Sequence, residues 1–489
     1  MREPLYSLEP LFPNRLSGEN LAVQLARRLR EAVESGALPL GTRLLGSREL
    51  AKRLGLGRNT VALAFEQLTA EGYFETQQGA GTFVAASHRK PLRSSASSPR
   101  PKSSRAARAA SLRGYFSIAK GAGPLRPGMP DLAKFPAASW NRSAKKALRV
   151  YDGDLGYAPA SGLQSLREAI AVHVRQFRGI AAQPDQIVVV EGAQAAIHLS
   201  AFVLGRPHGR VVVEDPCYAL ARAAFEMHDL QLYPVRVDRD GLVVDALPRD
   251  AALAFVTPTH QFPLGGALPF GRRSALLEWA ARRDGTYIIE DDYDSEFTFK
   301  TRPLPPLQTL DREERVVYVG SFSKTLAPAV RLGYIIAPPH LASAFTTARA
   351  CTSLGVSIAL QATLANFIAE GHYARHIRRM NAVYERRRAI LIEALSPALG
   401  ADFRLGPSQS GLHVALIGGR RFDDAGTASA ANGHRLVALS QLCIRRRDCR
   451  GYVLGFTNGS DREIQSAASE VAKRIGLKRA VRPALITAK

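Results

Sequence analysis

The sequence predicts an α/β protein in three parts: a small N-terminal domain (residues 1–85), a linker (86–113) and a large C-terminal domain (114–489). Short apolar runs alternate with helical stretches beyond residue 114, which is typical of a mostly parallel sheet covered by helices. Amphipathic spacing and glycine-containing turns dominate the first part, as expected of short packed helices. The basic, Ser- and Pro-rich segment between them has the composition of a linker.

Three helices are expected in the N-terminal domain. Apolar residues recur at every fourth position of the first helix: Leu21, Leu25, Leu29 and Val33. Ser47 is the expected cap of a short second helix, and residues 55–57 form a tight turn before a third helix. That helix exposes Arg58, Asn59 and Thr60 at its start. This layout, followed by an expected hairpin over residues 73–84, predicts a helix-turn-helix with a wing.

The linker carries eight Lys or Arg residues and no acid between residues 88 and 113. Such a segment cannot bury enough apolar surface to offset its ordering entropy, so we expect a flexible tether. Its charge either adds sequence-independent affinity for DNA phosphates or only keeps a spacer soluble. The whole chain has a formal charge of +23, which fits a polyanionic partner without proving one.

Several classes of protein are disfavoured. No apolar run approaches the roughly 18 residues of a membrane span, and the N-terminus lacks the apolar core of a signal peptide. The four cysteines are scattered without C-x-x-C spacing, so neither a zinc site nor a disulfide framework is indicated. We expect a cytoplasmic protein that uses no membrane and no metal.

Residues 286–338 carry the candidate chemistry. One apolar run ends at Asp291 and a second ends at Ser321, followed by Ser323, Lys324 and Arg331. Ligands of open parallel sheets bind beyond the carboxyl ends of the strands. A lysine can form a Schiff base with an aldehyde, a carboxylate can hold a pyridine nitrogen, and hydroxyls with a guanidinium can hold a phosphate. The pattern therefore predicts pyridoxal 5′-phosphate (PLP), against the alternative of a solvated acidic turn and a surface lysine.

On these residues, the segment resembles fold-type-I, aspartate-aminotransferase-like enzymes. It resembles still more the MocR regulators, which join such a domain to a GntR-type winged helix. Residues 25–85 resemble that winged helix along their whole length, with Leu45, Gly46 and Gly57 as departures. The resemblance implies contacts with double-stranded operator DNA by Arg48, Arg58, Asn59 and Thr60, and by the wing tip at Gly79, Gly81 and Thr82.

The resemblance also implies roles around PLP. Lys324 would form the internal aldimine, Asp291 would hold the pyridinium, Tyr218 would stack on the ring, and His260 and Tyr293 would flank the ring hydroxyl. The implied phosphate-binding residues are Gly192, Ala193, Gln194, Ser321, Ser323 and Arg331. Tyr157 would reach the phosphate of a neighbouring subunit, which implies a homodimer, and Arg450 would grip an effector carboxylate. Arg331 and a protonated pyridine are expected to lower the pKa of Lys324.

These expectations favour a PLP-dependent, DNA-binding transcriptional regulator that senses PLP itself or a small amine or amino acid through Lys324. The spacing of Asp291 and Tyr293 is the one found in the regulators. An active aminotransferase with a vestigial winged helix is the alternative, because the groups needed for turnover are present.

Overall fold

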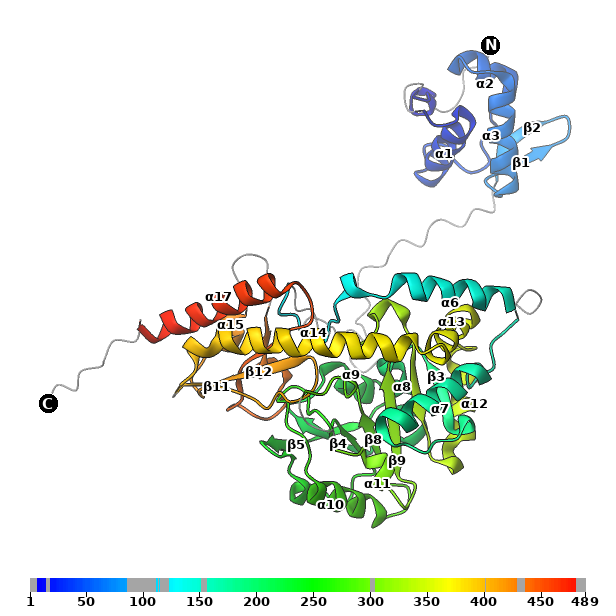
Figure 1. Cartoon of the computed structure of the whole chain (residues 1–489). Helices are drawn as coiled ribbons and strands as arrows, with labels where there is room; N and C mark the ends of the chain where they lie inside the picture. The colour runs from blue at the N-terminus through cyan, green and yellow to red at the C-terminus, as the bar shows by residue number, and fades with distance from the viewer. Residues whose placement is uncertain are drawn as a thin grey trace. The chain divides into compact units, whose positions relative to one another are not determined.

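The computed structural model describes residues 7–14, 18–85, 111, 112, 114, 123–150, 156–299, 304–400, 402–428 and 436–480. The chain divides into two compact units, Met1–Lys102 and Ser103–Lys489 (Figure 1). Most of the expected linker, including residues 86–110, lies outside the described residues.

The N-terminal unit has the predicted winged helix-turn-helix layout. Its elements are η1 (Glu9–Leu11), α1 (Leu21–Glu34), α2 (Ser47–Leu54), α3 (Arg58–Ala70), β1 (Phe74–Gln77) and β2 (Gly81–Val84). Leu25, Leu50, Val61 and other apolar residues of the three helices form one buried cluster. The prediction that Ser47 caps α2 is wrong, because Gly46 is the N-cap and no side chain caps the helix.

The wing is anchored to the chain before α2. Strands β1 and β2 are antiparallel, and Arg43 forms an isolated bridge with Phe83. The backbone N–H of Leu44 donates to the carbonyl of Thr82 at 2.8 Å. The wing therefore moves with the segment that leads into the helix-turn-helix.

An eight-stranded sheet forms the centre of the C-terminal unit, in the order β3-β10-β9-β8-β7-β4-β5-β6. The strands are β3 (Ile187–Val190), β4 (Arg210–Asp215), β5 (Gln231–Asp238), β6 (Gly241–Leu242), β7 (Leu253–Val256), β8 (Tyr287–Asp291), β9 (Val316–Ser321) and β10 (Gly333–Ile336). The neighbours from β9 through β8, β7 and β4 to β5 are parallel, as predicted. Strand β10 runs antiparallel to both β3 and β9, and β6 runs antiparallel to β5.

Helices surround this sheet and continue into the C-terminal region. They are α6 (Ala137–Val150), α7 (Gln164–Arg178), α8 (Ala193–Leu204), α9 (Ala219–Met227), α10 (Phe270–Ala281), α11 (Leu307–Leu310), α12 (Pro339–Thr352), α13 (Ile358–Ala369), α14 (His372–Leu395), α15 (Asp424–Thr427), α16 (Leu439–Leu442) and α17 (Asp461–Ala480). Short 3-10 turns are η2 (Leu132–Lys134), η3 (Pro184–Gln186), η4 (Val244–Ala246), η5 (Pro328–Val330) and η6 (Ser396–Ala398). Helices α14 and α17 lie side by side (Figure 1).

The region beyond residue 340 is largely helical, as expected, but it also contains a four-stranded antiparallel sheet that the sequence reading did not predict. Its order is β11-β12-β14-β13, with β11 (Phe403–Leu405), β12 (His413–Gly418), β13 (Val437–Ala438) and β14 (Arg450–Gly455). No helix among the described residues is both long enough and apolar enough to cross a bilayer.

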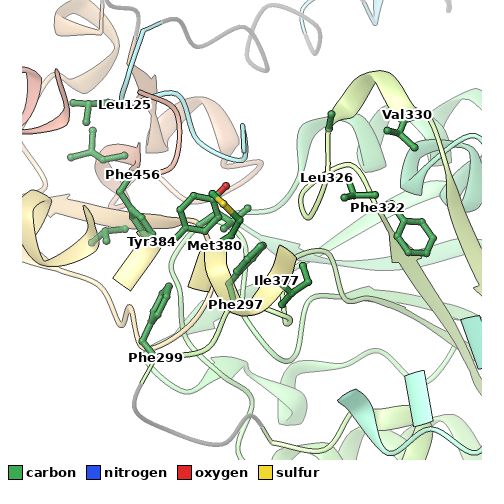
Figure 2. Close-up of a cluster of buried hydrophobic side chains, with 14 of the residues drawn as sticks. Leu125, Phe297, Phe299, Phe322, Leu326, Val330, Ile377, Met380, Tyr384 and Phe456 are labelled. Atoms are coloured by element: carbon green, nitrogen blue, oxygen red, sulfur yellow. The ribbon is translucent and has the colours of Figure 1, made fainter. Parts of the chain in front are cut away.

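A shared hydrophobic core joins the large sheet to the C-terminal region (Figure 2). Leu125 lies on the segment before η2, Phe297 follows β8, and Phe456 follows β14; all three are buried. Met380 and Tyr384 of α14 pack in the same cluster. This core fixes the loops that follow β8 and β14 relative to the segment 123–134, which we call the lead segment.

Candidate functional site

Lys324 lies three residues beyond β9 and meets the lead segment. Its Nζ donates a hydrogen bond of 2.8 Å to the carbonyl oxygen of Gly128. Gly128 has a φ of +67°, and a Cβ at this position would lie 2.8 Å from Nζ. A residue without a side chain is therefore required where the backbone passes the lysine.

The pKa of Lys324 is lowered, mainly because burial disfavours its charged form. The carboxylates of Asp294 and Asp291 oppose this shift, and the guanidinium of Arg126 adds to it. The lowered pKa was predicted, but Arg331 is not among its causes here: burial acts first and Arg126 adds to it, while the expected effect of a protonated pyridine stays a prediction. A lowered pKa increases the fraction of neutral amine, the form that attacks an aldehyde.

Asp291 ends β8 and is 5% exposed. Its Oδ1 is buried and has no hydrogen-bond partner among the described residues. Burial, with the neighbouring Asp292 second, raises its pKa to about 7. A buried carboxylate oxygen without a donor is costly, and a protonated pyridine nitrogen is a donor that would satisfy it. This orphaned oxygen fits the predicted role of Asp291 toward PLP.

A second part of the site suits a phosphate. Gly192 is the N-cap of α8, and a Cβ there would lie 3.7 Å from both Arg331 Nη1 and Ser323 Oγ. Ser321 Oγ accepts a hydrogen bond from the backbone N–H of Ser323 at 3.2 Å. Arg331 has a φ of 49°, unusual for a residue other than glycine. The start of a helix, a hydroxyl and a guanidinium thus converge as a phosphate site requires.

The other two predicted phosphate residues open the same helix. Ala193 is the first residue of α8, so its backbone amide is one of the helix's unpaired donors. Gln194 Nε2 donates to the carbonyl oxygen of Leu220 at 2.9 Å, and its buried Oε1 has no partner among the described residues. The side chain of Gln194 thus ties α8 to α9.

Tyr218 is the N-cap of α9. Burial raises the pKa of its phenol, Asp291 raises it further, and Arg331 opposes the shift. Tyr218 is therefore close enough to Asp291 and Arg331 for both charges to affect its phenol. Its ring packs edge-on against Phe262, with centroids 6.0 Å apart.

His260 and Tyr293 contact one another beside the ends of β7 and β8. Tyr293 Oη donates to the carbonyl oxygen of His260 at 3.0 Å and lies 3.0 Å from His260 Nδ1. The same nitrogen lies 3.1 Å from both carboxylate oxygens of Asp294. The buried ligand atoms of His260, Asp294 and His413 lie within 4.8 Å of one another, close enough to share a metal ion. The sequence argument against a zinc site rested on the spacing of the cysteines. It carried no information about this cluster, which contains no cysteine.

For two predicted residues, no contact with this cluster is present among the described residues. The ring of Tyr157 is 85% exposed. Arg450 begins β14, and its Nη1 lies 3.4 Å from Asp424 Oδ1, while its buried Nε finds no partner in the described part of the chain. None of its hydrogen bonds among the described residues reaches Lys324. The roles given to Tyr157 and Arg450 remain predictions.

Buried ion pairs support the site from behind. Arg178 Nε lies 2.8 Å from Asp292 Oδ2, and Tyr318 Oη donates to the same oxygen at 2.7 Å. This pairing fixes the residue next to Asp291. Burial alone would lower the pKa of Arg178, but the combined effects of Asp292, Tyr318 and Glu290 raise it, so the guanidinium keeps its charge in the interior.

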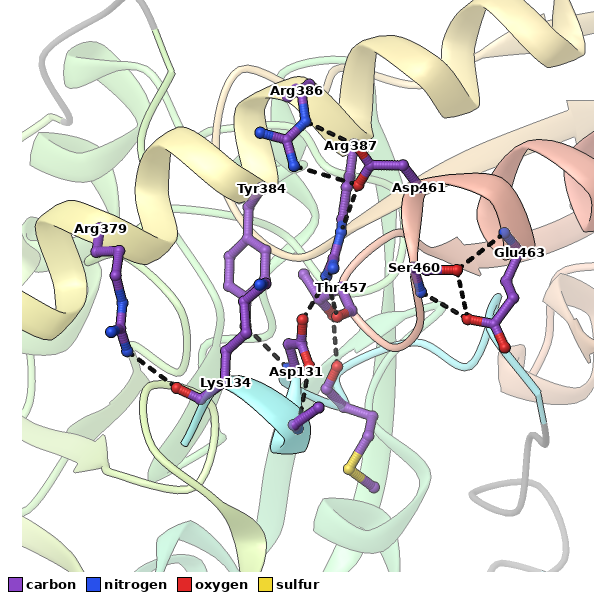
Figure 3. A network of polar contacts seen from close by, with 12 residues as sticks. Asp131, Lys134, Arg379, Tyr384, Arg386, Arg387, Thr457, Ser460, Asp461 and Glu463 are labelled. Carbon is purple, nitrogen blue, oxygen red and sulfur yellow. Dashed lines mark hydrogen bonds and ion pairs between the residues drawn. The ribbon is translucent and has the colours of Figure 1, made fainter. Parts of the chain in front are cut away.

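A second network holds the lead segment (Figure 3). Arg387 Nη2 lies 2.9 Å from Asp131 Oδ2, and its Nε lies 3.1 Å from Asp461 Oδ1. Tyr384 Oη accepts a hydrogen bond from the backbone N–H of Asp131 at 3.0 Å. Thr457 Oγ1 donates to the carbonyl of Met129. The segment that presents Gly128 to Lys324 is thus attached to α14 and to the start of α17.

The predicted DNA-binding residues gather at two places on the N-terminal unit. Arg58 and Asn59 are exposed at the start of α3, with Thr60 beside them, and Arg48 is exposed on α2. Gly57 is the N-cap of α3, as expected from its position. Gly79 and Gly81, both at positive φ, form the tip of the wing with Thr82.

Two models of known protein families match this chain. Residues 21–84 match the model of bacterial regulatory proteins of the gntR family, and residues 129–437 match aminotransferase class I and II. The chain is 35% identical over 445 residues to the probable rhizopine catabolism regulatory protein MocR of Rhizobium meliloti, covering 88% of this chain and 89% of that protein. The chain belongs to the MocR subfamily of GntR-type regulators.

Other MocR-type and aminotransferase relatives agree. The HTH-type pyridoxine biosynthesis transcriptional regulator PdxR of Corynebacterium glutamicum is 32% identical over 470 residues, covering 96% of this chain and 99% of that protein. The crystal structure of Pyrococcus horikoshii kynurenine aminotransferase superposes with a TM-score of 0.69 and 25% identity, over 76% of this chain and 95% of that one. The large unit therefore has the fold-type-I aminotransferase fold expected for a MocR protein, and this fold implies PLP binding.

Proposed function

We propose that this MocR protein is a PLP-dependent, DNA-binding transcriptional regulator that senses PLP itself or a small amine or amino acid. The observation that carries the proposal is the grouping of Lys324 with Asp291 and with the Gly192–Arg331 cradle, in a chain that also has a winged helix-turn-helix. The Gly192–Arg331 cradle is the phosphate site that Gly192, Ser323 and Arg331 form. As a DNA-binding regulator it would act in the cytoplasm.

Lys324 would hold PLP covalently, Asp291 would accept a hydrogen bond from its ring nitrogen, and Arg331 with Ser323 and the α8 amides would hold its phosphate. When bound, PLP supplies an aldehyde that primary amines can capture in competition with Lys324. Tyr218 would stack on the ring, while His260 and Tyr293 would flank its hydroxyl. An effector can change DNA binding only through different affinities for two states of the protein.

The N-terminal unit would read an operator through the start of α3. Arg58, Asn59 and Thr60 occupy the position from which recognition helices contact base edges. Arg48 and the wing tip at Gly79, Gly81 and Thr82 would add contacts to the DNA backbone or the minor groove.

A homodimer completes the proposal. Tyr157 is 85% exposed and therefore accessible to a second subunit. It would there reach the neighbouring phosphate site, as the family resemblance implies. Dimeric regulators read two half-sites, so two winged helices would engage one operator.

The test uses the purified full-length protein. PLP addition should produce the visible absorbance of lysine-bound PLP, and titration with single amines should reveal which of them perturbs it. A labelled promoter fragment should then bind with an affinity that depends on PLP or on that amine. A protein that never acquires the absorbance would refute the PLP part of the proposal.

An active aminotransferase remains the alternative, since a lysine able to move protons and a carboxylate for the pyridine nitrogen are present. Transfer of nitrogen from an amino acid to a keto acid, with promoter output independent of Lys324, would favour it. Loss of operator binding on removal of residues 1–85, without detectable transfer, would favour the regulator.

A further inference from the structure

Arg126 lies on the lead segment, which contacts Lys324. It stands two residues before Gly128, whose carbonyl oxygen accepts the hydrogen bond from Lys324 Nζ at 2.8 Å. The carbonyl oxygen of Arg126 packs against Gly455 at the end of β14. A Cβ placed on Gly455 would lie only 2.2 Å from that oxygen. The backbone of Arg126 is therefore held between the lysine and the small antiparallel sheet.

Arg126 as a residue is neither fully buried nor fully exposed, and its guanidinium has no hydrogen bond or ion pair to any residue that the structure describes. It nevertheless acts on Lys324, whose pKa it lowers. The five N–H donors of a guanidinium suit a charged acceptor, and a carboxylate can accept two of them side by side. The guanidinium of Arg126, which no described side chain neutralises, is therefore a candidate binding site for an anion near Lys324.

Two other arginines of the predicted site, Arg331 and Arg450, already have partners or a predicted ligand. Arg331 lies in the Gly192 cradle with Ser323, where a phosphate would neutralise it. Arg450 lies 3.4 Å from the buried carboxylate of Asp424. Arg450 and Gly455 are the first and last of the six residues of β14, so their Cα atoms lie about 17 Å apart along the strand.

We propose that Arg126 binds the carboxylate of an effector whose amine reaches Lys324. Arg126 would act as a planar, bidentate donor, the geometry that carboxylates prefer. The inference rests on the proposed function and names its ligand class: amines that carry a carboxylate, in preference to simple amines.

The first test uses full-length protein loaded with PLP and three carboxylates without an amine: acetate, propionate and succinate, at constant ionic strength. The pH midpoint of the absorbance change of lysine-bound PLP is measured. A carboxylate bound beside this lysine should raise the midpoint by about one pH unit, because an opposite charge stabilises the protonated form. Arg126→Gln should raise the midpoint without any carboxylate and remove the response to carboxylates. Arg126→Lys should keep part of the response.

Arg450→Gln is the matched control, since it removes the same charge from the other candidate. It should respond to carboxylates as the wild type does. A response that survives Arg126→Gln, or one that is lost only in Arg450→Gln, overturns the inference and returns the role to Arg450. Because Arg126 has no side-chain partner among the described residues, its replacement leaves none of their buried groups unsatisfied, so the variant should fold.

A second measurement separates this inference from the proposed function. Calorimetric titration of the PLP-free protein with succinate should show binding that is weaker by roughly tenfold or more in Arg126→Gln. Equal binding in the two proteins, or none in the wild type, overturns the Arg126 assignment even when PLP binds normally. Absence of the PLP absorbance would instead refute the PLP part of the proposed function.

Discussion

The Nζ of Lys324 donates to the carbonyl oxygen of Gly128 at 2.8 Å, across 196 residues of sequence. The lysine therefore rests on a backbone that belongs to the lead segment and not to the sheet. In this arrangement the amine is held near Asp291 and Asp294 before any ligand arrives. Changes in the lead segment should consequently alter the reactivity of Lys324 without touching the lysine itself.

Gly128→Ala should weaken PLP capture. The new Cβ would lie 2.8 Å from Lys324 Nζ at a φ of +67°, so both a clash and backbone strain of about 1–2 kcal/mol are expected. Gly179→Ala is the control, because Gly179 has a φ of +72° with nothing within 4 Å of its Cβ position. Both variants should lose stability, but only Gly128→Ala should bind PLP less tightly in an absorbance titration. Equal PLP affinities would show that the contact does not position the lysine.

Lys324→Ala should abolish the absorbance of lysine-bound PLP and leave operator binding by the winged helix intact. For a regulator, the response of a reporter promoter to PLP or effector is then lost or altered. For an enzyme, nitrogen transfer vanishes while promoter output is unchanged. Lys145→Ala removes an exposed lysine of α6 and should behave as the wild type in every assay.

Asp291→Asn should weaken PLP binding and make the PLP-free protein less sensitive to pH. Burial raises the pKa of Asp291 to about 7, above the value of about 3.9 in an unfolded chain. Since the folded-state pKa is the higher one, stability present below about pH 4 is lost as the pH rises through about 7. Glu214 and Glu290 are shifted in the same direction, so part of the decline will remain in the variant.

The neighbouring aspartate supplies the contrast. Asp292→Asn leaves the buried guanidinium of Arg178 without its carboxylate, which costs about 3–5 kcal/mol. Thermal melts of the PLP-free proteins at pH 8 should therefore show Asp291→Asn at or above the wild type and Asp292→Asn well below it. The reverse order would contradict the assignment of Asp291 as an unsatisfied carboxylate.

Arg58→Ala should weaken specific operator binding and relax base preference at one position. Arg58 is exposed at the first turn of α3, and a good base contact is worth roughly 1–3 kcal/mol. Arg27→Ala removes an equal charge from α1, where Arg27 pairs with Glu19, and should not change base preference. Removing the charges between residues 89 and 108 should reduce binding to all sequences and flatten its dependence on salt. Unchanged operator affinity of Arg58→Ala would refute its role in readout.

Much of the site could be predicted because local sequence encodes strand ends. Asp291 and Ser321 each end a buried apolar run, and parallel strands bring such ends to one edge. Gly128, Asp294 and His413 were missed because they reach the site through tertiary packing, which no spacing in the sequence records. The antiparallel sheet β11–β14 was missed for a related reason. Its strands are separated by irregular segments, and β11, with three residues, is too short to show an alternation of apolar and polar residues.

Arg387→Met should destabilise the large unit and reduce PLP affinity, while Arg386→Met should do neither. Both arginines pair with Asp461, but Arg387 is 4% exposed and also bonds Asp131 of the lead segment, whereas Arg386 is 57% exposed. Breaking a buried pair from one side costs about 3–5 kcal/mol, and an exposed pair is worth about 0–1 kcal/mol. The loss in Arg387→Met should reach Lys324 because Asp131 lies three residues after Gly128. Thermal melts and PLP titrations of the two variants test this prediction, because the substituted arginines are adjacent and share Asp461 as a partner. Equal PLP affinity in both variants would show that the lead segment holds its position without Arg387.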